Sequence, residues 1–174
     1  SDRAIFVGAG NYQAVGGGAL VSSIVRGGSE TFTEIWDDVS LGAIFGNCGA
    51  RFINPAAATA TIFVTFASTV DLAVAGAIYL SGVHQTTPVG THAEAGGNSG
   101  TSSVNVSSAT DELVLDNVIA AAATITVGAG QTSRWEQENG GVGVSGGGST
   151  EAGAATVTMS WTHAAGDWGI RGVP

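Results

Sequence analysis

Residues 59–83, TATIFVTFASTVDLAVAGAIYLSGV, decide the fold predicted for this chain. Apolar side chains alternate in the first half, where Ile62, Val64 and Phe66 share one side, and the second half repeats the alternation. A period of two in stretches rich in Val, Ile, Phe and Thr is typical of β-strands. Residues 68–71 form a polar turn, so we expect a hairpin at the centre of a sheet. Apolar or small side chains occupy both faces, which predicts that both are covered.

Further strands are predicted on either side of this hairpin. We expect them at 3–9, 19–26, 31–38, 41–45, 50–53, 102–106, 112–120, 124–130, 131–138, 155–162 and 168–173. The polar residues 84–100 and the Gly-rich residues 139–149 are expected to be loops. The Ala120–Ala123 run precedes β-branched residues, which favour strand over helix. The prediction is an all-β, two-sheet antiparallel sandwich, jelly-roll or Ig-like, with about ten to twelve short strands.

Composition limits the classes of partner. The 174 residues fit a single domain, 1–174. Five arginines and no lysine face fourteen acidic residues, and the net charge is −9. Nucleic acids and anionic membrane surfaces need clustered cations, so we expect neither as a partner. Membrane insertion is not expected either, because no apolar run approaches the ~20 residues that span a bilayer.

Low charge suggests self-association. Only 11% of residues are charged and the mean hydropathy is +0.29, so we expect apolar surface to be covered by other copies of the chain. An open sheet edge can accept a strand from a neighbour. The apolar segment Ala4, Ile5, Phe6 and Val7 is the predicted donor, and the start of the chain suits a mature, processed end.

Several ordered motifs in the second half resemble a known module. VAGAIYLSGVHQTTPVG (74–90), ELVLD (112–116), VGAGQTSRW (127–135) and TVTMSWTHAAGDWGIRGV (156–173) resemble a β-sandwich module that recurs in bacterial secreted and cell-surface proteins and in some phage structural proteins. The resemblance covers roughly residue 19 onward. It implies a jelly-roll or Ig-like sandwich with a structural or adhesive role, located extracellularly or on a cell or virion surface. It brings no catalytic residues.

Catalytic and metal-binding patterns are weak. No Gly-x-Ser-x-Gly elbow occurs on a strand-to-helix turn, and Ser99 falls in the expected loop, so we expect no enzyme. His84, His92 and His163 lack the spacing of zinc ligands. No cofactor is expected, although a structural calcium ion is kept as an alternative because acidic residues recur, at Asp37-Asp38, Asp71, Asp111-Glu112 and Asp116. Cys48 is the single cysteine, so it is either a small core residue or a thiol that pairs between chains.

Tryptophans carry the alternative function, a monomeric carbohydrate-binding or adhesive module that recognises surface glycans. Sugars stack on exposed aromatic rings beside polar side chains. Trp161 shares the side of Val157 and Met159, which predicts a core position, and Trp168 is expected in the core as well. Trp36 and Trp135 stand beside charged residues and are the candidate stacking platforms.

Overall fold

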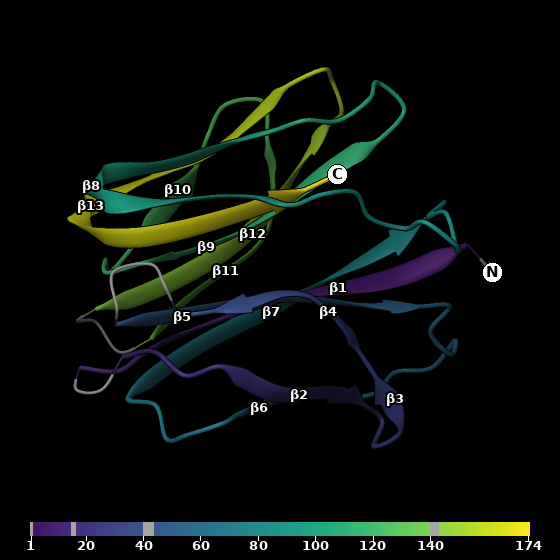
Figure 1. Cartoon of the computed structure of the whole chain (residues 1–174), viewed down its shortest axis with the longest axis horizontal. Coiled ribbons are helices and arrows are strands. Elements are labelled where there is room, and N and C mark those ends of the chain that lie inside the picture. Colours follow the sequence, from purple (N-terminus) through teal and green to yellow (C-terminus); the bar gives the residue numbers. More distant parts are fainter. Residues whose placement is uncertain (1, 15–16, 40–43, 140–142) are drawn as a thin grey trace.

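The computed structural model describes residues 2–14, 17–39, 44–139 and 143–174. Their regular segments are all β-strands, and thirteen strands form three sheets stacked in layers (Figure 1). The all-β prediction is therefore confirmed. The expected number of sheets, two, and the expected ten to twelve strands are both too low, because some predicted loops contain strands and three short strands, at residues 21–26, 30–31 and 62–66, form a third sheet.

The central sheet has four antiparallel strands in the order β4-β5-β1-β7. Their bounds are β1 Arg3–Tyr12, β4 Thr33–Asp38, β5 Phe45–Ile53 and β7 Leu72–Ser81. Strand β1 pairs with β5 on one side and with β7 on the other along its whole length. The predicted strand at 41–45 falls partly outside the described residues, and the described part joins 50–53 as the single strand β5.

The small sheet lies below the central sheet in Figure 1. It has the order β3-β2-β6, with bounds β2 Val21–Arg26, β3 Glu30–Thr31 and β6 Ile62–Phe66. Side chains from β1 and β5 meet side chains from β2 and β6 in one hydrophobic cluster; its buried members are Ile5, Val7, Ala9, Ile24, Phe32, Cys48 and Ala50.

The large sheet lies above the central sheet in Figure 1. Its strands run in the order β10-β13-β9-β12-β11, and β8 pairs with β13. Their bounds are β8 Ala93–Val106, β9 Leu113–Ala120, β10 Ile125–Val127, β11 Thr132–Asn139, β12 Val144–Ala152 and β13 Val157–Val173. The register of β13 shifts between Thr162 and Gly166, so one long strand replaces the two predicted at 155–162 and 168–173. Its first half pairs with β10 and its second half with β9.

The predicted central hairpin is wrong. Both halves of residues 59–83 are strands, but β6 pairs with β2 in the small sheet and β7 pairs with β1 in the central sheet. Residues 67–71 therefore connect two layers. Alternation shows that a segment is extended but does not identify its neighbour, and here long-range pairing decided both partners.

Two expected loops contain strands. Residues 93–100 of the expected loop 84–100 belong to β8, which pairs with β13 despite its Gly, Asn and Ser content. Within residues 139–149, β12 begins at Val144, while 140–142 lie outside the described residues. Three glycines of β12 leave room for neighbouring side chains, Val74 at Gly146 and tryptophan rings at the other two. A Cβ at Gly147 would meet Trp161, and one at Gly148 would overlap Trp135. Packing, rather than turn formation, explains this glycine run.

Candidate functional site

The small sheet leaves part of the central sheet uncovered. Strand β3 runs through Phe32 directly into β4, which aligns the two sheets at that edge. Strands β2 and β6 then cover β5 and β1, and none of the described β7 side chains joins the cluster between the sheets. The position beside β6 and opposite β7 is therefore open; we call it the strand slot.

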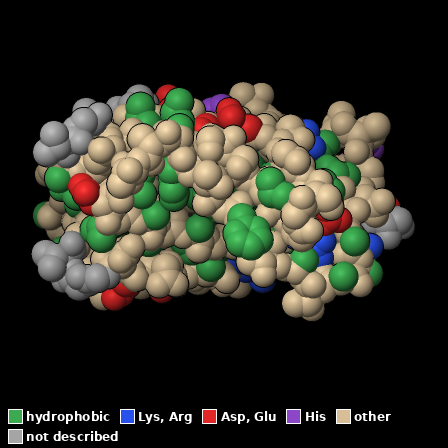
Figure 2. All heavy atoms as spheres, turned by 90° about the horizontal axis from the view of Figure 1, so that it is seen from below, with side chains coloured by type: hydrophobic (Ala, Val, Ile, Leu, Met, Phe, Trp, Pro, Cys, Tyr) green, Lys and Arg blue, Asp and Glu red, His purple; other side chains and the backbone are tan. Residues whose placement is uncertain are grey.

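The strand slot is apolar and uncharged. On the side of β7 that faces it, Ala75 and Ala77 are exposed and Tyr79 is 54% exposed. Among the described residues β6 pairs with β2 alone, so its other edge leaves backbone groups unpaired. Phe63 on the outer side of β6 is 59% exposed. Figure 2 views the molecule from this side, where charged side chains lie mostly toward the margins.

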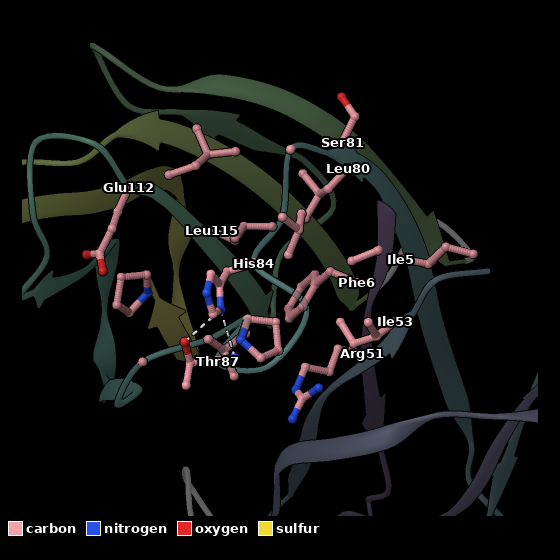
Figure 3. A pocket seen from close by; sticks show the side chains of 18 of the residues that line it. Ile5, Phe6, Arg51, Ile53, Leu80, Ser81, His84, Thr87, Glu112 and Leu115 are labelled. Carbon is pink, nitrogen blue, oxygen red and sulfur yellow. Dashed lines mark hydrogen bonds between the residues drawn. The ribbon is translucent and has the colours of Figure 1, made fainter. Parts of the chain in front are cut away.

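A groove of about 620 Å³ opens between the central and large sheets at one end of the molecule (Figure 3). Phe6, Leu80 and Leu115 contribute apolar side chains, and Phe6 and Leu115 also belong to the buried cluster that joins the two sheets. One wall is loop 82–90. Its ends are fixed by backbone hydrogen bonds: Val83 N–H donates to the Asp2 carbonyl and Gly90 N–H to the Pro174 carbonyl, both over 3.0 Å.

Polar side chains line the rim of this groove. His84 Nδ1 accepts a hydrogen bond from Thr87 N–H at 3.0 Å and lies 2.9 Å from the Thr87 hydroxyl oxygen. Glu112 accepts a hydrogen bond from Ala109 N–H at 2.7 Å. The side chain of Arg51 has no hydrogen bond or ion pair with a described residue, and its Nε is shielded from solvent. Arg51 is therefore an unpaired cation that lines the groove.

Asp116 forms a buried network inside the large sheet. Its Oδ1 accepts hydrogen bonds from Ser149 N–H at 2.6 Å and from the Ser149 hydroxyl at 2.9 Å, and its Oδ2 from Trp161 Nε1–H at 2.7 Å and Gln131 Nε2–H at 3.3 Å. Burial raises the pKa of Asp116 to about 6, despite these donors, which lower it. Asp116 and Ser149 are completely buried, so the network supports the fold and meets no substrate.

Arg171 links three strands. Its fully buried guanidinium donates to Asp38 of β4, and its Nη2 lies 3.1 Å from Glu94 of β8. Removing one partner of a buried ion pair leaves an uncompensated charge, which makes this contact a structural connection between the central and large sheets.

The predicted stacking tryptophans are not surface platforms. Trp36 is only 4% exposed; it packs against Phe6 and its Nε1–H donates to Asn47 Oδ1 at 2.9 Å. The expectation that Trp36 stands on the surface is wrong, because Gly49 leaves room for its ring between the sheets. Trp135 is half-buried over Gly76 and Gly148. Trp161 is in the core as predicted, whereas Trp168 is only partly buried.

The predicted donor segment has partners within its own chain. Ala4, Ile5, Phe6 and Val7 are buried in β1, the strand with neighbours on both edges. The expectation of a free terminal strand therefore does not fit this structure. Among the outer strands of the three sheets, β6 instead offers an edge that is unpaired within the described residues.

The remaining predicted candidates are dispersed. His84 lies at the groove, His92 contacts the Trp36 ring at a tilted angle, and His163 is in β13. Within the described ranges no group of three His, Cys, Asp or Glu side chains is placed to hold a metal ion. Asp37 accepts Val21 N–H at 2.7 Å, and its burial raises its pKa to about 6. Ser99 lies in β8, where its hydroxyl accepts from Trp168 Nε1–H.

Cys48 is a buried side chain of β5. It is 3% exposed within the cluster between the central and small sheets, and burial raises the pKa of its thiol. This position suits the interpretation of Cys48 as a small core residue.

Sequence reasoning missed both the strand slot and the groove. The slot depends on which strands pair across layers, and the groove joins residues from the start and the middle of the chain. No pattern distinguishes Arg51 from the other four arginines, because all five lie in strands. Among the described residues no helix is long and apolar enough to cross a membrane.

Comparisons with family models, with curated proteins and with solved structures find no match for this chain, so the resemblance to a surface module stays a prediction.

Proposed function

We propose that this chain is a structural, self-assembling β-sandwich subunit of an extracellular, cell-surface or virion-surface assembly, without catalytic activity. One observation carries the proposal: an uncharged, exposed strand face lies beside an unpaired strand edge, in the strand slot between β6 and β7. An added strand would gain backbone hydrogen bonds from β6 and cover Ala75, Ala77 and Tyr79.

The shape of the slot favours an open assembly. Strand β7 extends the central sheet one strand beyond β6. Two β6 edges cannot pair antiparallel about a two-fold axis perpendicular to the sheets, because β7 of each copy would overlap β1 of the other. The strand that enters the slot must therefore be a different segment of the neighbouring copy. Such a heterologous contact produces rings or filaments when it is repeated.

Particle size tests this proposal. Light scattering and negative-stain microscopy of the wild-type chain should show oligomers or filaments at neutral pH. Ala77→Lys places a charge in the slot and should reduce the particles to monomers. Thr162→Lys, on an exposed position of β13, is the matched control and should assemble normally. A wild-type monomer that persists on concentration, or equal assembly of both variants, would contradict the proposal.

A further inference from the structure

The groove between the central and large sheets has the volume of a small-molecule site, with an apolar floor and polar side chains at its rims. Its volume of about 620 Å³ lies within the roughly 300–1,000 Å³ common for such sites. Ile53, Leu80 and Leu115 line it together with Phe6, and this floor continues into the buried core between the sheets. Leu113 on the wall is 38% exposed, although it begins a strand that is otherwise buried. The apolar part of a ligand would cover the floor of the groove and Leu113.

Arg51 gives the groove a single positive contact. The side chain has no acidic partner among the described residues, and its Nε is removed from solvent without an acceptor. A partly desolvated cation without a partner is unfavourable, and a carboxylate is the acceptor that matches a guanidinium best. The groove therefore favours an acidic head group at Arg51.

The opposite rim limits the ligand to one negative charge. Glu112 lies across the groove from Arg51, with His84 and Thr87 between them (Figure 3). Asp111 lines the same rim as Glu112. These two acids would repel a second anionic group, whereas an uncharged chain can pass between the rims.

The groove is formed before any ligand arrives. Loop 82–90 is fixed at both ends by backbone hydrogen bonds, and Thr87 N–H donates to His84 within it. Little conformational entropy is then lost on binding.

We propose that this groove binds a monoanionic amphiphile, such as a medium-chain fatty acid, with its apolar chain along the floor and its carboxylate at Arg51. The site is separate from the strand slot, which lies on the small-sheet side of the central sheet. Ligand binding and self-assembly can therefore be tested independently.

Calorimetric titration with octanoate, decanoate and dodecanoate, each below its micelle-forming concentration, tests the apolar floor. Affinity should rise about fourfold per added methylene group for as long as the chain is buried, which corresponds to ~0.8 kcal/mol per methylene. The absence of saturable dodecanoate binding, or an affinity independent of chain length, would overturn the proposal.

Arg51→Gln tests the head-group contact. It should weaken dodecanoate binding at least tenfold and leave dodecanol binding unchanged, while Arg51→Lys should retain most of the preference for the acid. Leu113→Gln should weaken both ligands. Arg134→Gln, at an exposed arginine whose Nε donates to Thr150 Oγ1, is the matched control. Equal effects of Arg51→Gln and Arg134→Gln on dodecanoate would contradict the assignment.

Discussion

The two sides of strand β7 differ in what covers them, although apolar or small residues occupy both. Val74 and Ile78 face the large sheet and are 3% and 5% exposed. Ala75, Ala77 and Tyr79 face the small sheet, and all three are exposed. The difference comes from the neighbouring layers: the large sheet covers β7, whereas the small sheet ends at β6 and has no strand opposite β7.

The side chains themselves reflect this difference in cover. The covered side carries branched residues and the open side carries mostly alanine, which exposes little apolar area until a partner arrives. An exposed strand face is therefore informative about assembly when an unpaired strand edge lies beside it. Strand β8, at one edge of the large sheet, differs, because it carries polar and glycine residues over residues 96–103.

The largest expected effect is on the covered side of β7. Ile78→Ala removes a buried side chain from the cluster that contains Phe6 and Trp36, so the free energy of unfolding should fall by about 2–5 kcal/mol. Urea denaturation with tryptophan fluorescence measures this loss. A loss under about 0.5 kcal/mol would mean that the large sheet does not cover β7 as described.

A fully buried acidic side chain should contribute more to the pH dependence of stability than a half-buried one. The folded-state pKa of Asp116 is about 6 against an ordinary 3.8, so the folded chain holds this proton more tightly than the unfolded chain. Unfolding free energy should therefore fall as pH rises from about 4 to about 6, by about 3 kcal/mol from this group.

Asp116→Asn is the test of that assignment. At low pH the variant should be less stable than the wild type by about 1–3 kcal/mol, because its amide N–H₂ faces a hydrogen-bond donor of the network. Between pH 4 and 7, however, its free energy of unfolding should change much less than that of the wild type. Asp37 has a similar folded-state pKa but is only half-buried, and solvent screens its charge, so Asp37→Asn should flatten the profile less. Equal pH slopes for Asp116→Asn and the wild type would contradict the role of burial.

Gly76→Ala tests one contact between β7 and the large sheet, that of Gly76 with the Trp135 ring. A Cβ at Gly76 would overlap the Trp135 ring, so the ring must move, at a cost of about 1–3 kcal/mol. The fluorescence of Trp135 should shift to longer wavelength as it becomes more exposed. Gly82→Ala, at a glycine with no atom near its added Cβ but a φ of +75°, is a control for backbone strain alone. An unchanged spectrum for Gly76→Ala would place Trp135 elsewhere.

The smallest effect on stability is expected on the open side. Ala77→Lys should change the free energy of unfolding of the monomer by no more than about 0.5 kcal/mol, because the position is exposed. Thermal unfolding at dilute concentration measures this. A large loss of stability would mean that Ala77 is covered within the monomer and that the strand slot does not exist.

Local patterning predicted strands well but not their partners. The alternation of residues 62–66 and 72–81 indicated two extended segments, and both are strands. Nothing in the alternation could show that they belong to different sheets, because pairing depends on Val25 and Phe6, which are distant in sequence. The same limit hid the strand slot.

Glycine content misled the prediction where packing uses glycine. Residues 144–149 looked like a loop, yet Gly147 and Gly148 admit two tryptophan rings. Charged neighbours likewise suggested an exposed Trp36, but Asp37 accepts a hydrogen bond from Val21 N–H of the small sheet, and Asp38 pairs with the buried Arg171. These outcomes depend on contacts between layers, which a single sequence does not display.

Amide hydrogen exchange of β6 tests the central claim most directly. The account predicts that amides within Ile62–Phe66 that do not bond to β2 exchange rapidly in dilute wild-type protein and become protected as concentration rises. The free edge of β8 should not change, and Ala77→Lys should remain unprotected at β6. Rapid exchange at β6 at every concentration, or protection that appears at β8 instead, would contradict assembly through the strand slot.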